Sequence, residues 1–117
     1  MFRVIIAGSR NFSNYPMLKS YADYMLSNVK DDILILCGQA AGADTLGEQY
    51  ANERGYQIQY FPADWKKYGK SAGFRRNVDM AQNANALIVF WDGKSHGTKH
   101  MIAVAQKYHL KIRVKKF

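Results

Sequence analysis

Five short runs of apolar residues alternate with segments that have helical periodicity, and this alternation limits the folds open to the chain. The runs are rich in β-branched and aromatic residues and predict strands at Val4–Ala7, Ile33–Cys37, Ile58–Phe61, Ala86–Trp91 and Lys111–Val114. The first, second and fourth runs are apolar almost throughout, without the in-out alternation of a half-exposed sheet. This pattern is typical of parallel strands that are covered on both faces.

Four helices are expected between these strands. In the first, apolar residues recur every three or four positions from Leu18 to Val29, and Pro16 suits its first turn. The second is expected over Asp44–Arg54, the third over Ala72–Asn83 and the fourth over Thr98–Tyr108.

The second helix carries its own boundary signals. Thr45 and Glu48 have the spacing of a capping box, and Gly55 supplies a stop. Its start therefore lies against a glycine-bearing loop.

Strand and helix alternation with short connections predicts an α/β fold, a Rossmann-like three-layer sandwich with a five-stranded parallel sheet. The expected strand order is 3-2-1-4-5, and residues 1–117 are interpreted as one domain. Strands one and four are then neighbours where the order reverses. Ligands of such sheets bind at that point, beside the carboxyl ends of the strands.

The formal charge of +8 is unevenly distributed. Residues 1–60 carry five Lys/Arg and six Asp/Glu, whereas residues 61–117 carry twelve against three. This basic half could attract nucleic acid or small phosphorylated ligands, or be plain solvated surface, and charge alone does not choose among these. No apolar run is long enough to span a membrane, and no secretion signal is visible, so a cytoplasmic protein is expected.

Small residues gather in the loops after strands one, two and four. These loops are Gly8-Ser9-Arg10, Gly38-Gln39-Ala40-Ala41-Gly42-Ala43-Asp44 and Asp92-Gly93-Lys94-Ser95-His96-Gly97-Thr98. One such loop would be an ordinary tight turn, but three around one crevice suit a phosphate-bearing ligand, because glycine lets backbone amides approach an anion. The spacing matches neither GxGxxG nor a Walker motif, so P-loop ATPase chemistry is not expected.

The stretch 64–77 is long for a connection and mixes aromatic and cationic residues. Arg75 or Arg76 could deliver a guanidinium to a phosphate. Trp65, Tyr68 or Trp91 could stack on a base, or the stretch could be a solvated basic loop anchored by its aromatics.

Metal and nucleophile chemistry have weaker support. His96 and His100 have a zinc-compatible spacing, but no third ligand follows at a diagnostic interval, so we expect no metal and no cofactor. No nucleophile elbow surrounds Ser9 or Ser95. The single cysteine, Cys37, is interpreted as a small buried apolar residue.

Five segments together resemble the YspA/YpsA-related branch of the SLOG superfamily, named for Smf/DprA and the Lonely guy phosphoribohydrolases. They are Val4–Phe12, Gly38–Asp44, Phe61–Trp65, Arg76–Ala81 and Phe90–Thr98. The resemblance extends over essentially the whole chain and implies a Rossmannoid sheet that binds nucleotides or nucleotide-derived molecules. It also implies a homodimer.

The phosphoribohydrolases of that superfamily provide a residue-level comparison. Their Arg-Lys-x-x-Met motif resembles Arg76-Asn77-Val78-Asp79-Met80, which favours Arg76 over Arg75. Their Pro-Gly-Gly-x-Gly-Thr-x-Glu-Glu loop resembles the Gly97-Thr98 region, but Lys99-His100-Met101 follows and the glutamates are missing. A lysine and a histidine add positive potential where a glycosidic transition state becomes positive, so the departure favours binding without hydrolysis.

Asp44 or Asp92 could still supply a carboxylate. Their ordinary roles are helix N-cap for Asp44, which we expect, and turn former for Asp92, which stays open.

The sequence therefore predicts a basic protein that binds a nucleotide or nucleotide-derived phosphate ligand, for sensing or sequestration. The alternatives are an N-glycosidic hydrolase, with Asp92 and Arg76 as catalytic candidates, and a single-stranded nucleic-acid binder. The expected ligand-binding residues are Gly8, Ser9, Arg10, Gly38, Gln39, Gly42, Ala43, Asp44, Arg76, Asn77, Trp91, Asp92, Gly93, Ser95, Gly97 and Thr98.

Overall fold

The computed structural model describes residues 1–117 and contains one sheet of five parallel strands in the order β3-β2-β1-β4-β5. The strands are β1 (Phe2–Gly8), β2 (Ile33–Cys37), β3 (Gln57–Tyr60), β4 (Ala86–Trp91) and β5 (Lys111–Lys116). The predicted Rossmann-like architecture and strand order are confirmed. β1 and β4 lie side by side at the centre, where the chain reverses the direction in which it adds strands.

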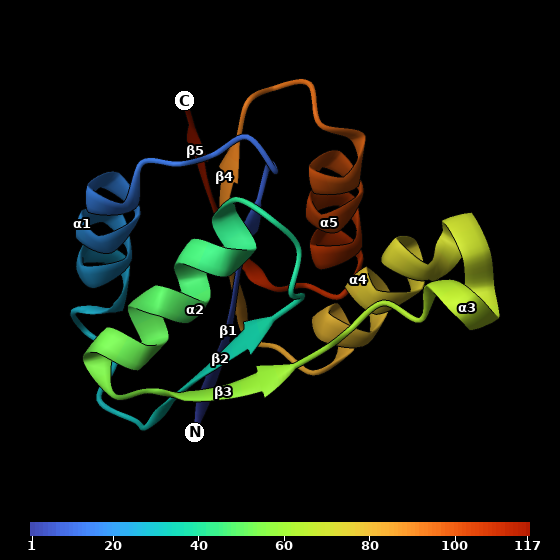
Figure 1. The fold of residues 1–117 in the computed structure, drawn as a ribbon. Helices are drawn as coiled ribbons and strands as arrows, with labels where there is room; N and C mark the ends of the chain where they lie inside the picture. Colours follow the sequence, from blue (N-terminus) through green and yellow to red (C-terminus); the bar gives the residue numbers. More distant parts are fainter.

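Helices cover both faces of this sheet. They are α1 (Tyr15–Leu26), α2 (Ala43–Arg54), α3 (Trp65–Tyr68), the 3₁₀ turn η1 (Gly69–Ser71), α4 (Ala72–Gln82) and α5 (His96–Lys107). Figure 1 shows α1 and α2 on one side of the sheet and α3, α4 and α5 on the other. Crossovers between parallel strands are right-handed, so the helices change face when the direction of strand addition reverses between β1 and β4.

Two apolar cores lie on the two faces of the same central strands. Val4 and Ile6 of β1 belong to the core beneath α1 and α2, while Ile5 and Ala7 belong to the core beneath α4 and α5. Successive side chains of a strand point to opposite faces, so a strand covered on both sides is apolar at every position. This is why β1, β2 and β4 have no polar alternation.

The helix boundaries follow the local capping residues. α1 has Asn14 as its N-cap, whose side chain accepts a hydrogen bond from the Met17 amide at 3.1 Å, and Pro16 lies in its first turn. α5 begins at His96 because Ser95 caps it, so the helix starts two residues before the predicted Thr98. Gly55 ends α2 in a left-handed conformation with φ of 74°, as its sequence position indicates.

The predicted capping box of α2 is wrong. Its N-cap is Gly42, which makes no side-chain hydrogen bond. Thr45 donates its hydroxyl to the Ala40 carbonyl at 3.0 Å, and Glu48 accepts from the Tyr60 hydroxyl at 2.8 Å. Both side chains are therefore used in contacts outside the helix terminus.

The stretch after β3 forms short helices instead of an irregular loop. It forms α3 and η1 before α4 begins, and the Asp64 side chain caps α3 through the Lys67 amide at 3.1 Å. None of the helices has both the length and the apolar character that crossing a bilayer requires.

Candidate functional site

A pocket of about 150 Å³ opens at the carboxyl edge of the sheet, on the face covered by α4 and α5. Apolar side chains of the core beneath α4 and α5 line part of it: Ala7 of β1, Met80 of α4 and Met101 of α5. Arg10, Lys70 and Arg76 are the cations among its lining residues, and Asp44 is the carboxylate. The pocket thus lies at the predicted crevice and carries a net positive charge.

Four polar side chains are buried in the protein: Ser9, Asp44, Asn77 and Thr98. Three of them line the pocket, and Ser9 lies next to it in the chain, between Gly8 and Arg10. Buried polar groups are costly unless they are hydrogen-bonded. Their concentration at this edge shows where the protein places polar chemistry against its core.

The loops after β1 and β4 are joined by Ser9. Its amide donates to the Phe90 carbonyl at 2.9 Å, and its hydroxyl accepts from the Asp92 amide at 3.2 Å. The Asp92 carboxylate in turn accepts from the amides of Lys94 at 2.9 Å and Ser95 at 2.8 Å, and these amides are the main reason that its pKa lies below the usual value. Asp92 therefore forms the turn before α5 and is not a lining residue.

The loop after β2 places Asp44 inside the pocket wall. The expectation that Asp44 caps α2 is wrong, because the helix begins at Ala43 with Gly42 as its cap. Asp44 is only 4% exposed, and its carboxylate accepts from the Ala40 amide at 3.3 Å. Burial raises its pKa to about 6, opposed by the neighbouring Arg76 guanidinium. A carboxyl group in this state can exchange a proton near neutral pH.

Arg76 extends from α4 toward the loop after β2. Its Nη1 donates to the Gly38 carbonyl, and its Nε donates to the Asn77 side-chain oxygen at 3.2 Å. Desolvation lowers its pKa, and Asp44 opposes that effect. The remaining nitrogen, Nη2, makes no hydrogen bond within the protein. It lies beside Gly73, where an added Cβ would be 3.7 Å away. This nitrogen can therefore donate to an anion.

Asn77 links α4 to the start of α5. Its side-chain amide donates to the Gly97 carbonyl at 3.4 Å and to His100 Nδ1 at 3.2 Å. The His100 ring stacks on Phe74 with ring centroids 4.2 Å apart, and burial lowers its pKa. The contact favours the neutral imidazole with its proton on Nε2. No group of three His, Cys, Asp or Glu side chains has an arrangement that could hold a metal ion.

The structure brings half of the predicted ligand-binding residues to the pocket. Those that line it are Gly8, Arg10, Asp44, Arg76, Asn77, Ser95, Gly97 and Thr98. Those that do not line it are Ser9, Gly38, Gln39, Gly42, Ala43, Trp91, Asp92 and Gly93. Several of the second group shape the loops instead; Trp91, for example, donates its indole N–H to the Ser95 carbonyl at 3.2 Å.

Sequence reasoning did not select Phe74 or Lys70, although both line the pocket. Both lie in the stretch 64–77, and its mixture of aromatic and cationic residues was the feature of the sequence that could have indicated them as ligand-binding residues. Trp65, one of the proposed stacking residues, also lines the pocket and is 53% exposed. Arg75 lies instead over the Tyr68 ring, 4.3 Å from its centroid, so the choice of Arg76 agrees with the pocket lining.

The fold and the pocket define a Rossmann-like protein with its candidate site at the point where the strand order reverses. Residues 2–68 match the model of the YspA, cpYpsA-related SLOG family, and the chain belongs to this family. It is 31% identical over 113 residues to the gene 61 protein of Mycobacterium phage D29, with 92% of this chain and 90% of that protein covered.

Among solved structures, the chain is similar to the DNA processing protein A, DprA, of two bacteria. The Streptococcus pneumoniae protein superposes with a TM-score of 0.73 at 15% identity, over 97% of this chain and 49% of that one. The Helicobacter pylori protein, whose single-stranded DNA binding mode that structure describes, superposes with a TM-score of 0.68 at 19% identity, over 97% and 64%. The chain thus spans about half to two thirds of these proteins, and the likeness shows the shared fold.

Proposed function

We propose that this protein binds a nucleotide or a nucleotide-derived phosphate ligand in the pocket at the carboxyl edge of the sheet. The observation that carries the proposal is the convergence of Arg10, Lys70 and Arg76 on a pocket where α4 and α5 begin. Guanidinium groups bind phosphate through charge-assisted hydrogen bonds, and the amides at a helix start favour negative charge.

The size of the pocket suggests how such a ligand lies. Small-molecule sites usually enclose about 300 Å³ or more, whereas this pocket has about 150 Å³. The phosphate end would therefore be enclosed near Arg76, and the base would lie at the mouth. There Trp65, 53% exposed, and Phe74, 48% exposed, offer ring faces for stacking.

Family membership supports the same class of ligand. The resemblance to the SLOG superfamily implies a nucleotide or nucleotide-derived ligand, the chain belongs to the YspA, cpYpsA-related SLOG family, and the structurally similar H. pylori protein is described with a single-stranded DNA binding mode. Sensing or sequestration of the ligand would follow from binding alone, because the glutamates of the phosphoribohydrolase motif have no counterpart after Thr98.

The test is a ligand screen followed by Arg76→Ala. Thermal shift over mono-, di- and cyclic nucleotides, NAD and ADP-ribose should reveal a ligand, since saturation at about 100 times the dissociation constant adds about 2.7 kcal/mol of stability. Arg76→Ala should then weaken binding of that ligand by about 1.5 to 3 kcal/mol in titration calorimetry, because a hydrogen bond to a charged group is lost.

Arg75→Ala is the matched control. Arg75 is the adjacent arginine of the same helix, but it is exposed and does not line the pocket. Its removal changes net charge equally and should leave affinity within about 0.5 kcal/mol of the parent protein. An equal loss of binding affinity in the two variants would show that the effect comes from the net charge of the protein, and it would contradict a specific role for Arg76.

A second candidate function is hydrolysis of an N-glycosidic bond, and the buried Asp44 favours it. This is the carboxylate that lines the pocket, and its pKa of about 6 leaves it mostly ionised at neutral pH. An ionised carboxylate beside the sugar would stabilise the positive charge of an oxocarbenium-like transition state. Asp92, bound to two backbone amides of its own turn, is less well placed for that role.

Incubation with nucleoside monophosphates separates the two functions. Release of free base that disappears in Asp44→Asn and persists in Asp92→Asn would establish the hydrolase, and binding without release would establish the binder. A homodimer also stays a prediction, and sedimentation velocity of the full chain measures it directly.

A further inference from the structure

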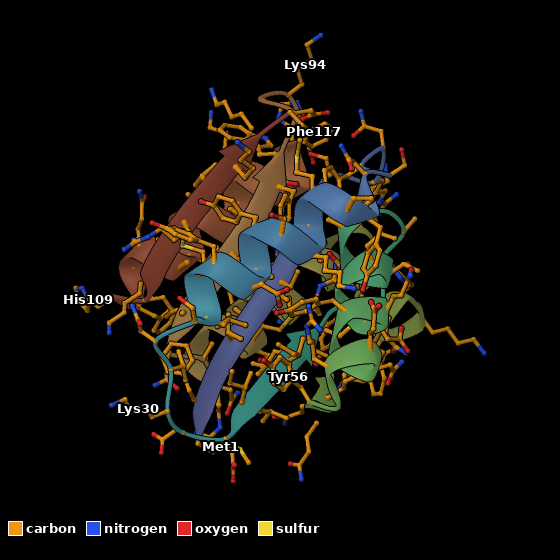
Figure 2. The ribbon with its side chains drawn as sticks, turned by 90° about the vertical axis from the view of Figure 1, so that its left-hand side faces the viewer. Met1, Lys30, Tyr56, Lys94, His109 and Phe117 are labelled. Atoms are coloured by element: carbon orange, nitrogen blue, oxygen red, sulfur yellow. The ribbon has the colours of Figure 1, made fainter.

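Strand β5 presents a row of cations on the face of the sheet that α1 covers. Lys111, Arg113 and Lys115 pair with β4 residues that belong to the core beneath α1, so their side chains point to that side. Figure 2 shows β5 beside α1 with no helix over it. These three residues, called here the β5 track, lie along the edge strand on the face of the sheet opposite to α4 and α5; Lys111 and Arg113 are exposed and Lys115 is half-buried.

No acidic side chain neutralises the β5 track. Residues 93–117 contain seven Lys/Arg and no Asp or Glu. None of the three ion pairs in the protein involves the track. Asp23 of α1 accepts from Tyr50 at 2.6 Å and pairs with Arg54, both on α2, so it faces away from β5. The positive charge of the track is therefore uncompensated by its neighbours.

Aromatic rings on α1 flank the β5 track. Lys115 lies over the Tyr21 ring, 5.9 Å from its centroid. Tyr24, three residues further along the helix and therefore on the same flank, is 74% exposed. A hollow of about 110 Å³ is lined by Met25 of α1, the residue after Tyr24, together with Lys111 and Arg113. Tyr21, Tyr24 and Lys115 do not line this hollow. An uncharged helix flank with two tyrosines thus borders a cationic strand across a groove.

We propose that this groove binds a single strand of nucleic acid. Alternate residues of a strand are about 6 to 7 Å apart, so the β5 track offers evenly spaced cations to successive backbone phosphates. Proteins that bind single strands combine such a cationic groove with aromatic side chains on which bases stack. A duplex keeps its bases stacked inside and gains nothing from Tyr21 and Tyr24. The proposal is independent of the nucleotide pocket, because it uses other residues on the other face of the sheet.

The experiment measures binding of a fluorescent oligothymidylate of about 16 nucleotides to the full chain by anisotropy, a length that covers common single-strand site sizes. In the test variant, Lys111, Arg113 and Lys115 are all changed to Gln. Affinity should fall at least about tenfold at low salt, and the slope of log K against log salt should fall by about 2, since each phosphate contact contributes about 0.7 for single strands. Tyr24→Ala should lower affinity at least about fivefold.

The matched control changes Lys66, Lys67 and Lys99 to Gln. These lysines are exposed on α3 and α5, and the variant loses the same three charges. Its salt slope should match that of the parent chain. Equal weakening of the two triple variants would overturn the proposal, as would an unchanged affinity in the track variant, because the lysines would then only protect the sheet edge from pairing.

Two further measurements distinguish the alternatives. If Arg76→Ala abolishes oligonucleotide binding while the track variant does not, the strand lies in the pocket and the proposal is wrong. Binding to vesicles rich in phosphatidylserine in preference to the oligonucleotide would also overturn it. Circular dichroism and thermal melting of each variant test whether it is folded. A loss of affinity in a folded variant then arises from the substituted surface residues and not from unfolding.

Discussion

Asp44 shows how burial changes the chemistry of one residue. The same carboxylate on an exposed helix start would have an ordinary pKa and stabilise the helix dipole. Here its desolvation outweighs the nearby Arg76 guanidinium and the Ala40 amide, and its pKa rises to about 6. A folded-state pKa above the unfolded value means that the folded protein binds the proton more tightly, so ionisation of Asp44 costs stability as pH rises.

We predict that Asp44→Asn makes the protein more stable at pH 7 than the parent chain. The pKa rises from 3.8 to about 6 on folding, and a shift of that size corresponds to about 3 kcal/mol between pH 4 and pH 7. The asparagine oxygen can still accept from the Ala40 amide, and the negative charge at position 44 is no longer buried. Urea unfolding at several pH values measures the difference in the free energy of unfolding.

The pH dependence provides the control for this substitution. The stabilising difference should be small near pH 4, where the parent carboxyl is protonated in the folded state, and should grow as pH rises through 6. A difference that is constant from pH 4 to pH 7 would show that Asp44 does not titrate in this range and that the effect arises from packing.

At the scale of elements, the start of α2 depends on close contact between two loops. Gly42 has φ of 75° and ψ of −124°, a conformation that is strongly disfavoured for residues with a Cβ. The Ser9 carbonyl accepts from the Ala43 amide at 3.4 Å, so the loop after β1 lies directly against the start of α2. A Cβ on Gly42 would lie 2.5 Å from the Arg10 carbonyl oxygen and closer still to that of Ser9.

We predict that Gly42→Ala destabilises the protein by at least about 2 kcal/mol, because backbone strain and a clash with two carbonyls add together. Gly93→Ala is the matched control, since Gly93 also has a positive φ of 82° but a Cβ there would meet nothing within 4 Å. It should cost only the backbone strain, about 1 kcal/mol. Similar free energies of unfolding for the two variants would show that the loops separate without cost.

Local sequence rules identified most elements but placed some of their ends incorrectly. The strands β2 and β4 have the predicted bounds, because an apolar run ends at a glycine or an aspartate in each case. The capping box of Thr45 and Glu48 was wrong because the loop contacts of Gly42 fix the helix start earlier. The short helix α3 was not predicted, because the four residues Trp65–Tyr68 are too few to show a helical periodicity.

At the scale of the whole molecule, two cores share their strands. Ile5 and Ile6 are adjacent in β1 but lie in different cores, because their side chains point to opposite faces. Neither face can lose its helices without exposing the strands that support the other. This arrangement is the basis for interpreting residues 1–117 as one domain.

We therefore predict a single cooperative unfolding transition. Far-ultraviolet circular dichroism and tryptophan fluorescence should give the same midpoint, since Trp91 reports on β4, Trp65 on α3, and dichroism on all helices. Leu18→Ala beneath α1 and Met101→Ala beneath α5 remove fully buried side chains from different cores. Each should lower the free energy of unfolding by about 2 to 5 kcal/mol within that one transition. A second transition in either variant would indicate two separately folding units.

The parallel sheet, its two helical layers and the edge at which a site would form were predicted from the sequence, and the strand order was predicted on the assumption that the chain winds outward from β1 and then returns to the other side. Apolar runs, glycine stops and short connections are local properties, and only a parallel sheet with right-handed crossovers satisfies them together. Which loop residues face the pocket was decided by the tertiary structure. Gly8, at the end of β1, and Gly97, in the first turn of α5, line it, whereas Gly38 and Gly93, in the loops after β2 and β4, do not. The burial that raises the pKa of Asp44 and the position of Phe74 at the pocket depend on atoms far apart in the chain, so no local pattern could encode them.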